Sequence, residues 1–318
     1  MLEKPKLAVS SCLLGKKVRY NGDAAEFRKL TREWSEHLEL LGVCPEVGIG
    51  LGTPRPTIRL VKSNEKISLI DPKNDIDYTD KMLEFAEIQA DFLIDSGICG
   101  FVFKKDSPSC GLERVRVYRE QGESAVRDGR GMFAKVFTTL YPHIPVIEEG
   151  RLTDPLQAEH FLARVHFFNE WHSLGKQGWT ASNLMRFHAE HKLFLLSRAP
   201  ESKRQLGRII AQGFDERKHP ETVALAYMTE AQRYLSVMTK RGRIATAMER
   251  VVGKIPQMSK HDKKELLEVI HQFRRGILPR SAAIVLLSHH INANGANNPI
   301  NQNLLNPVPL SMGIMAKV

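Results

Sequence analysis

Three of the four cysteines lie in turn-rich sequence directly after predicted strands, and thiolates are soft metal ligands. Cys12, Cys44 and Cys110 occur in the segments SSCLLGKKVRYNG, CPEVGIGLGTPRP and KKDSPSCG, none of which contains a CxxC pair. A compact zinc knuckle is therefore not expected. Three thiolates leave one position open on a zinc ion or on a 4Fe–4S cluster, as in catalytic sites. Ligand chemistry alone leaves zinc, an iron–sulfur cluster and no metal as alternatives.

Two kinds of residue beside these cysteines are suited to proton chemistry. Glu46 follows Cys44 by two positions, so an extended backbone directs both side chains to one side, where the carboxylate can act as a general base. The alternative is a surface carboxylate or a charge at a helix N-terminus. Ser107 and Ser109 flank a proline just before Cys110, where short hydroxyl side chains also commonly satisfy the amides of a turn.

Basic and aromatic residues accompany the first two cysteine segments. VRYNG contains Arg19, Tyr20 and Asn21, and the segment after Cys44 continues to Arg55 and Arg59. An arginine and an aromatic ring near a metal can hold a phosphate and a base. Ordinary loop contacts explain the same residues equally well.

The elements that position these residues are predicted from hydrophobic periodicity. Residues 1–152 show short apolar runs at KLAVS, LELLGV, ICGFVF, VRVY and IPVIEE, a hairpin formed by TIRLVK and KISLI, and helical spacing over residues 26–40, 78–96 and 131–141. Gly97 is expected to cap the second helix. This alternation predicts an α/β domain with a mostly parallel sheet, whose ligands bind at the carboxyl ends of the strands. Cys99 lies inside ICGFVF and is expected to be a buried, inert thiol.

The rest of the chain is predicted to be all-α. Helical periodicity recurs in FLARVHFFNEW, LMRFHAEHKLFLLS, RQLGRIIAQG, VALAYMTEAQRYLSVMT, KKELLEVIHQFRRG and SAAIVLLSHHI, and the tail after His290 reads as irregular. We expect a connecting helix over residues 153–180 and a helical domain over residues 181–318. His188 and His191 share a helix face, which favours a basic face over a metal pair because no partner ligand is evident in the sequence.

The positive charge is concentrated in this second half. The chain carries a formal charge of +10, yet residues 1–150 hold 22 basic and 23 acidic side chains, and the excess arises from residue 181 onward. A domain this basic favours a polyanionic partner such as RNA, although a merely solvated basic surface is the alternative. The residues predicted to contact RNA are Arg186, His188, Lys192, Lys203, Arg204, Arg208, Lys240, Arg241 and Arg243.

Composition limits the class of protein further. Hydrophobic residues make up 42% of the chain, but the longest apolar stretches are too short to span a membrane, and the start MLEKPKLAVS does not resemble a signal peptide. We expect a soluble, cytoplasmic protein with reduced thiols, no membrane association and no obligate protein partner. Irregular cysteine spacing argues against a disulfide framework.

The three cysteine segments, taken together and in order, resemble the thiouracil/thiouridine desulfidase family over roughly residues 5–150. The remainder, from FHAEHK to NQNLLNPVPL, is similar to the helical YbgA-type domain that is often fused behind it. This resemblance implies that Cys12, Cys44 and Cys110 hold a 4Fe–4S cluster with one iron lacking a protein ligand. It also implies catalytic roles for Glu46 and Ser107.

The resemblance further implies an activity, which is the removal of sulfur from 4-thiouridine in tRNA to give uridine and sulfide without net electron transfer. The residues expected to bind the substrate are Arg19, Tyr20, Asn21, Arg55 and Ser109. Two alternatives remain open at this point. One is desulfidation of free thiouracil, thiouridine or their nucleotides, and the other is a metal-stabilised RNA-binding module without catalysis.

Overall fold

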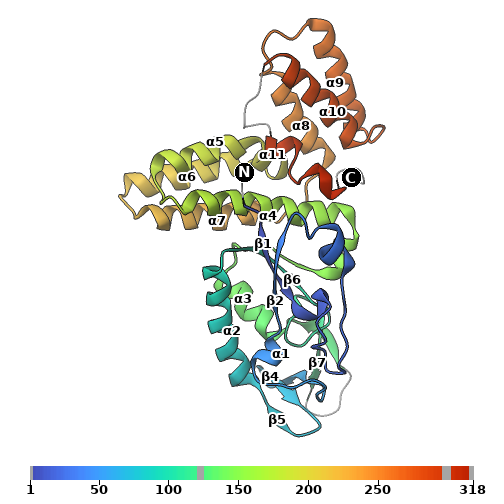
Figure 1. The fold of residues 1–318 in the computed structure, drawn as a ribbon. Coiled ribbons are helices and arrows are strands. Elements are labelled where there is room, and N and C mark those ends of the chain that lie inside the picture. The colour runs from blue at the N-terminus through green and yellow to red at the C-terminus, as the bar shows by residue number, and fades with distance from the viewer. Residues whose placement is uncertain (1–2, 120–124, 296–301, 315–318) are drawn as a thin grey trace. The chain divides into compact units, whose positions relative to one another are not determined.

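The computed structural model describes residues 3–119, 125–295 and 302–314 (Figure 1). The chain divides into two compact units, with the boundary between Gln157 and Ala158. Each unit has its own buried apolar core. The predicted domain limits at residues 152 and 180 remain predictions. Most of the connecting segment predicted between them lies in one helix, α4 (Pro155–Gly175).

The first unit is built on a four-stranded parallel sheet in the order β2-β1-β6-β9. Its strands are β1 (Lys6–Ser10), β2 (Glu39–Val43), β6 (Ile98–Phe103) and β9 (Val146–Glu148). All four were predicted from apolar runs, and the fold class is confirmed. Parallel pairing places the carboxyl ends of β1, β2 and β6 at one edge, which is where the loops carrying three cysteines begin.

Strand β6 forms the centre of this core, because all six of its residues are buried. Phe101 and Phe103 stack with ring centroids 3.7 Å apart, and both rings pack near Phe133 and Phe137 of helix α3 (Met132–Leu140). Fully burying one such side chain contributes about 1.5–3 kcal/mol. The aromatic cluster therefore fixes the strand from which the third cysteine loop departs.

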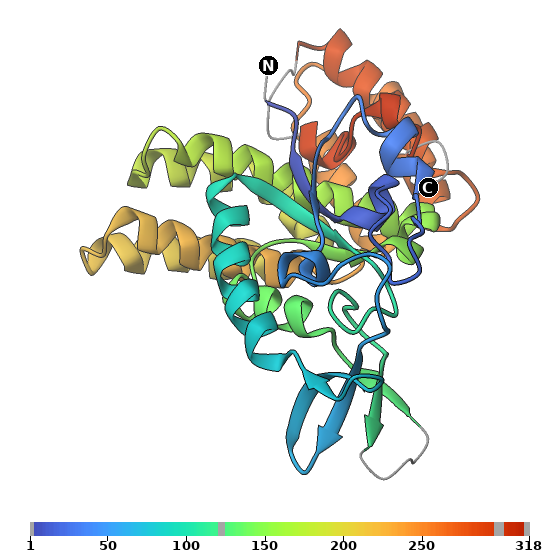
Figure 2. The same ribbon diagram turned by 60° about the horizontal axis from the view of Figure 1, so that its bottom comes forward.

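A second, mixed sheet has the order β5-β4-β3-β7-β8 (Figure 2). Its strands are β3 (Arg59–Ser63), β4 (Lys66–Asp71), β5 (Ile76–Asp77), β7 (Val115–Arg119) and β8 (Val126–Gly129). The predicted β3–β4 hairpin and strand β7 are confirmed, whereas β5 and β8 were not predicted. β3 pairs in parallel with β7, which joins the segment after the second cysteine to the segment after the third.

The helices of the first unit match the sequence predictions in two of three places. Helix α2 (Thr79–Asp95) and helix α3 lie where expected, and Gly97 ends α2 with φ +76° while its N–H donates to the Ile94 carbonyl over 2.8 Å. The predicted helix over residues 26–40 is wrong. Only a short π-helical turn, Lys29–Glu33, forms there, because the chain pairs with β1 from Glu39 onward and a single turn already buries Leu30 and Trp34.

The second unit is helical throughout its described residues. Its helices are α4, α5 (Ala181–Arg198), α6 (Ser202–Asp215), α7 (Pro220–Leu235), α8 (Arg241–Val252), α9 (Lys260–Arg274), α10 (Arg280–Ala293) and α11 (Gln302–Leu305). The all-α prediction is confirmed, although α8 was not predicted. In the tail, α11 and the short 3-10 helix Leu310–Met312 replace part of the expected irregular segment, and residues 296–301 and 315–318 lie outside the described residues.

Neighbouring helices bury a continuous core in this unit. Packing joins α5 to α6, α7 and α8, and it continues from α8 to α9 and from α9 to α10. A polar cluster lies within it, where Glu159 accepts hydrogen bonds from Arg198 and Arg280 over 3.3 and 3.4 Å. Within the described part of the chain, no helix is long and apolar enough to cross a membrane.

Candidate functional site

The three cysteine loops line a single cavity of about 350 Å³ in the first unit. Cys12 lies in the 3-10 helix Ser11–Leu14 directly after β1, and Cys44 follows the last residue of β2. Cys110 lies in the loop that leaves β6. Adjacent parallel strands therefore deliver one thiol each to the same wall. Cys99 is separate from this group, since it is buried within β6 with its Sγ 3.7 Å from the Gly97 carbonyl oxygen.

The environment of the thiols favours their neutral form in the absence of a metal. Burial raises the pKa of the Cys12 thiol to about 11, although the positive charge of Lys104 opposes this effect. Burial also raises the pKa of Cys110, against a hydrogen bond from the Ser10 side chain, and burial raises the pKa of Cys44. The charge of Cys44 also raises the pKa of Cys12 and of Cys110, so a bound cation favours the thiolate form of the group.

The spacing of the sulfur atoms bears on the choice of metal group. A tetrahedral zinc ion with Zn–S bonds of about 2.3 Å holds its sulfur ligands about 3.8 Å apart. Among the described residues, which include all three cysteines, the Sγ atoms of this group are not all within 4.8 Å of one another. A cluster of several iron and sulfide ions fits this donor set.

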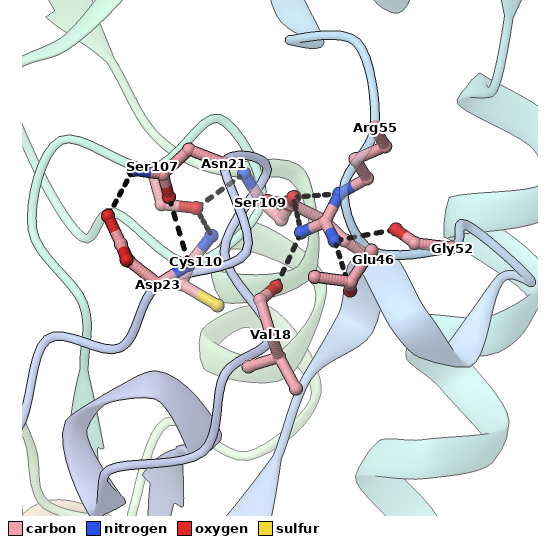
Figure 3. A network of polar contacts seen from close by, with 10 residues as sticks. Val18, Asn21, Asp23, Glu46, Gly52, Arg55, Ser107, Ser109 and Cys110 are labelled. Atoms are coloured by element: carbon pink, nitrogen blue, oxygen red, sulfur yellow. Dashed lines mark hydrogen bonds and ion pairs between the residues drawn. The ribbon is translucent and has the colours of Figure 1, made fainter.

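Glu46 is held rigidly at the cavity wall (Figure 3). Its Oε2 accepts two hydrogen bonds from Arg55, one from Nε at 3.0 Å and a shorter one from Nη2, and its Oε1 accepts from the Ser109 hydroxyl at 2.9 Å. The sequence prediction assumed an extended backbone at Glu46, and the structure does not have one there. Pro45–Gly48 forms the short helix α1, with Cys44 as its N-cap, because proline favours the first helical position.

Arg55 links three segments around the cavity. Besides the two bonds to Glu46, Nη2 donates to the Val18 carbonyl at 2.9 Å, and Nη1 donates to Gly52 O at 3.0 Å and to Thr53 Oγ1 at 3.3 Å. These acceptors engage all five N–H groups of the guanidinium. Because all of these N–H groups already have acceptors within the protein, Arg55 has no donor left for the predicted contact with a substrate. The contacts indicate that Arg55 positions Glu46 instead.

Replacing Arg55 by methionine is expected to lower the free energy of unfolding by about 3 kcal/mol, because the largely buried carboxylate of Glu46 then lacks its counter-charge. Urea-induced unfolding of the full chain measures this loss. Arg151→Met is the matched control, since its ion pair with Glu113 is about half exposed and should contribute less than about 1 kcal/mol. Equal losses in the two variants would show that the Arg55 network is not specially stabilising.

The two serines before Cys110 have different contacts. Ser109 is fully buried and its hydroxyl donates to Glu46. Like Arg55, it therefore positions the carboxylate and does not face a ligand in the cavity. The Ser107 Oγ lines the cavity and accepts from the amides of Ser109 and Cys110 at 3.2 and 3.0 Å. Ser107 therefore satisfies the amides of the turn, which is the alternative role considered from the sequence. Its hydroxyl proton can still be donated to another acceptor.

The other predicted substrate residues lie at or beside the cavity. Arg19 and Tyr20 line it, with the Arg19 guanidinium carbon 5.8 Å from the centre of the Tyr20 ring, and Tyr20 is 45% exposed. Asn21 instead donates from its Nδ2 to the Asp23 carboxylate at 2.6 Å, within the same exposed turn (Figure 3). Arg19 and Tyr20 are thus placed to meet a ligand, and Asn21 shapes the turn that carries them.

Sequence reasoning missed a polar group on the same wall. Lys104 donates through Nζ to Glu149 Oε1 at 2.5 Å, and Glu149 Oε2 accepts from the Lys105 amide at 2.8 Å. Ser10 Oγ accepts from the Lys104 amide at 3.0 Å and also contacts Cys110. The available signal was the placement of each residue at a strand end, in AVSSC, VFKKD and VIEEG.

The residues predicted to contact RNA differ in exposure within the second unit. Two of them, Lys192 and Arg243, are half-buried. Six others are exposed, namely Arg186, Lys203, Arg204, Arg208, Lys240 and Arg241. Burial lowers the pKa of His188 to about 4, so at neutral pH it is uncharged, and its Nδ1 lies 3.2 Å from the Tyr227 hydroxyl. His191 has a carboxylate partner that the sequence did not reveal, with its Nε2 3.0 Å from Glu170 Oε2.

The parallel sheet, the three thiols at its carboxyl edge and the fixed carboxylate define the first unit as an α/β domain with a candidate thiolate metal centre. Comparison with known proteins identifies its family. Residues 7–149 match the family model described as 2-thiouracil desulfurase. Residues 192–309 match a model described as a protein of unknown function (DUF1722), which confirms the second resemblance noted in the sequence.

One solved protein is similar in sequence to the same part of the chain. The chain is 32% identical to a [4Fe-4S]-dependent thiouracil desulfidase, TudS (DUF523Vcz), with coverage of 47% of this chain and 94% of that chain and a TM-score of 0.38. Given this identity over nearly the whole of that chain, the protein belongs to the 2-thiouracil desulfurase family through its first unit. No curated protein matches the chain.

Proposed function

We propose that the protein removes sulfur from a thiolated pyrimidine with the help of a 4Fe–4S cluster held by Cys12, Cys44 and Cys110. The observation that carries this proposal is the convergence of three thiols from neighbouring strand ends on one cavity that also contains a fixed carboxylate. The soft donor set fits a cluster. The similarity to a [4Fe-4S]-dependent thiouracil desulfidase supports the same group.

When bound, the cluster supplies an iron without a protein ligand, a Lewis acid that suits a soft sulfur atom. The reaction replaces the C=S group by C=O, with water as the source of oxygen and sulfide as the second product, so it needs no net electron transfer. Glu46, positioned by Arg55, accepts the proton of the attacking water. Ser107 donates its hydroxyl proton in a hydrogen bond that orients the ring.

For the substrate we propose 4-thiouridine in tRNA, because the charge of the second unit favours a polyanion. Residues 181–318 contain 21 basic and 10 acidic side chains. Burial and then the positive charges of Lys254 and Lys203 lower the pKa of Lys192, so these three ammonium groups lie within electrostatic range of one another. Such a cluster favours a phosphate backbone as partner. The cytoplasm, which contains tRNA and keeps thiols reduced, is the compartment that suits this activity.

Free thiouracil, thiouridine or a thiolated nucleotide is the second candidate substrate. It is favoured by the name of the similar solved protein and by a cavity size within the range of small-molecule sites. The third candidate, a non-catalytic RNA-binding module, has no comparable support from the cavity.

The test is incubation of the full chain, reconstituted anaerobically with iron and sulfide, with thiolated tRNA and separately with free 2-thiouracil and 4-thiouridine. We expect uridine to replace 4-thiouridine in digested tRNA, with one sulfide released per base. Turnover of the free compounds alone would favour the second candidate. A colourless zinc-containing protein that leaves all three substrates unchanged would exclude the desulfidase activity.

A further inference from the structure

A row of arginines crosses the outward face of the second sheet. Arg116 of β7 pairs in register with Arg127 of β8, so both side chains lie on one face. Leu60 of β3 pairs with Val117, which places Arg59 beside Arg116 on that same face because side chains alternate along a strand. All three arginines are exposed. Figure 2 shows these strands side by side at the lower end of the first unit.

This arrangement is electrostatically unfavourable for the free protein. Like charges directly opposite each other on paired strands destabilise a sheet. Arg127 is partly compensated by its ion pair with Asp106, whereas among the described residues Arg59 and Arg116 form no ion pair. Concentrating positive charge on three adjacent strands has no evident benefit for folding, which indicates that the charge serves a ligand.

An aromatic ring accompanies the arginines. Tyr118 lies two residues after Arg116 on the same face, and the Arg59 guanidinium carbon lies 4.8 Å from the centre of its ring. Guanidinium groups match phosphate oxygens with paired N–H donors, and an aromatic face can stack on a base. Alternating arginine and tyrosine side chains therefore suit a nucleic-acid strand better than a diffuse cloud of counter-ions.

The arginine face begins at the rim of the cavity. Thr57 and Ile58 line the cavity and directly precede Arg59, and Asp106, the partner of Arg127, lines it as well. A polyanion lying along this face therefore reaches the opening that the three thiols share. This continuity belongs to the first unit alone and does not depend on the basic helices of the second.

We propose that Arg59, Arg116, Arg127 and Tyr118 form an RNA-binding face of the first unit, which holds backbone phosphates of the RNA whose thiolated base enters the cavity. This inference rests on the proposed function for the identity of the base. It adds a substrate contact beside the catalytic cavity, where a phosphate held close to the thiolated nucleotide restricts the position of that nucleotide.

The test compares the double variant Arg59→Gln/Arg116→Gln with the unaltered full chain. We expect its Kd for thiolated tRNA to rise on the order of tenfold at physiological salt, and the slope of log K against log salt to fall by about 2. Its kcat/KM should fall similarly for thiolated tRNA and stay unchanged for free 4-thiouridine, because neither arginine lines the cavity. Arg59→Lys/Arg116→Lys should retain the salt slope.

The matched control is Lys81→Gln, an exposed cation in the first turn of α2, next to the opposite edge of the same sheet. It should leave the tRNA affinity unchanged. An unchanged Kd and salt slope in the double variant, or an equal loss with free 4-thiouridine, would overturn the proposed face. If the chain desulfurates neither substrate, the proposed function fails, yet the affinities of these variants for the same tRNA still decide whether the face binds RNA.

Discussion

Replacing Cys12 by serine is expected to abolish both cluster loading and desulfidation, whereas Cys99→Ser should retain both. Cys12 lies at the end of the middle of three strands, between the loops that carry Cys44 and Cys110, so its loss leaves two thiols that cannot enclose the site. Cys99 is 1% exposed within β6, and its Sγ lies 3.7 Å from the carbonyl oxygen of Gly97, away from the loops that carry the other three cysteines.

Iron and sulfide content and the visible absorbance of anaerobically reconstituted protein measure loading independently of activity. The unaltered chain should bind about four iron ions per molecule. Cys99→Ser controls for the loss of a buried thiol in the same sheet. Equal loss of iron in the two variants would refute the ligand assignment, and retention of iron by Cys12→Ser would remove that residue from the site.

The second large effect is expected for Glu46→Ala, which should keep the cluster but slow turnover by about 10² to 10⁴-fold. The carboxylate lies two residues after Cys44, a proposed ligand, and general-base catalysis typically contributes a factor of that size. Glu46→Gln preserves the shape of the side chain and its acceptor oxygen while removing the base, so it should be equally inactive. Single-turnover rates at saturating substrate measure the chemical step.

Ser109→Ala separates the base from its positioning. That change removes the hydrogen bond to Oε1 but leaves both bonds from Arg55, so we expect a much smaller loss than in Glu46→Ala. Iron content should match that of the unaltered protein in all three variants. An active Glu46→Gln enzyme with full iron content would exclude proton abstraction by Glu46.

The sequence was most informative where local pattern and tertiary context agree. The run ICGFVF is apolar at every position and became a fully buried strand, and the end of each predicted strand located a cysteine loop. Residues 26–40 show the opposite case. Phe27, Leu30, Trp34 and Leu38 have helical spacing, but pairing of the following segment with β1 ends the irregular turn early.

The roles of individual side chains were less predictable, because they depend on contacts between distant segments. Glu46 was chosen for its spacing from Cys44, yet its orientation comes from a short helix and from Arg55 and Ser109. Arg55 looks like a ligand-binding arginine in sequence, whereas its donors reach Val18 and Gly52. Lys104 and Glu149 became recognisable only when their strands were placed next to each other.

The hydrogen bonds of Ser107 leave its hydroxyl proton available to a ligand in the cavity. Two amides occupy the acceptor capacity of its hydroxyl, which leaves a donor on the wall, while the carboxylate of Glu46 can only accept. An acceptor on the ring, such as a carbonyl oxygen, complements the hydroxyl proton of Ser107. The turn that supports Cys110 is therefore also expected to influence which edge of a pyrimidine faces this wall.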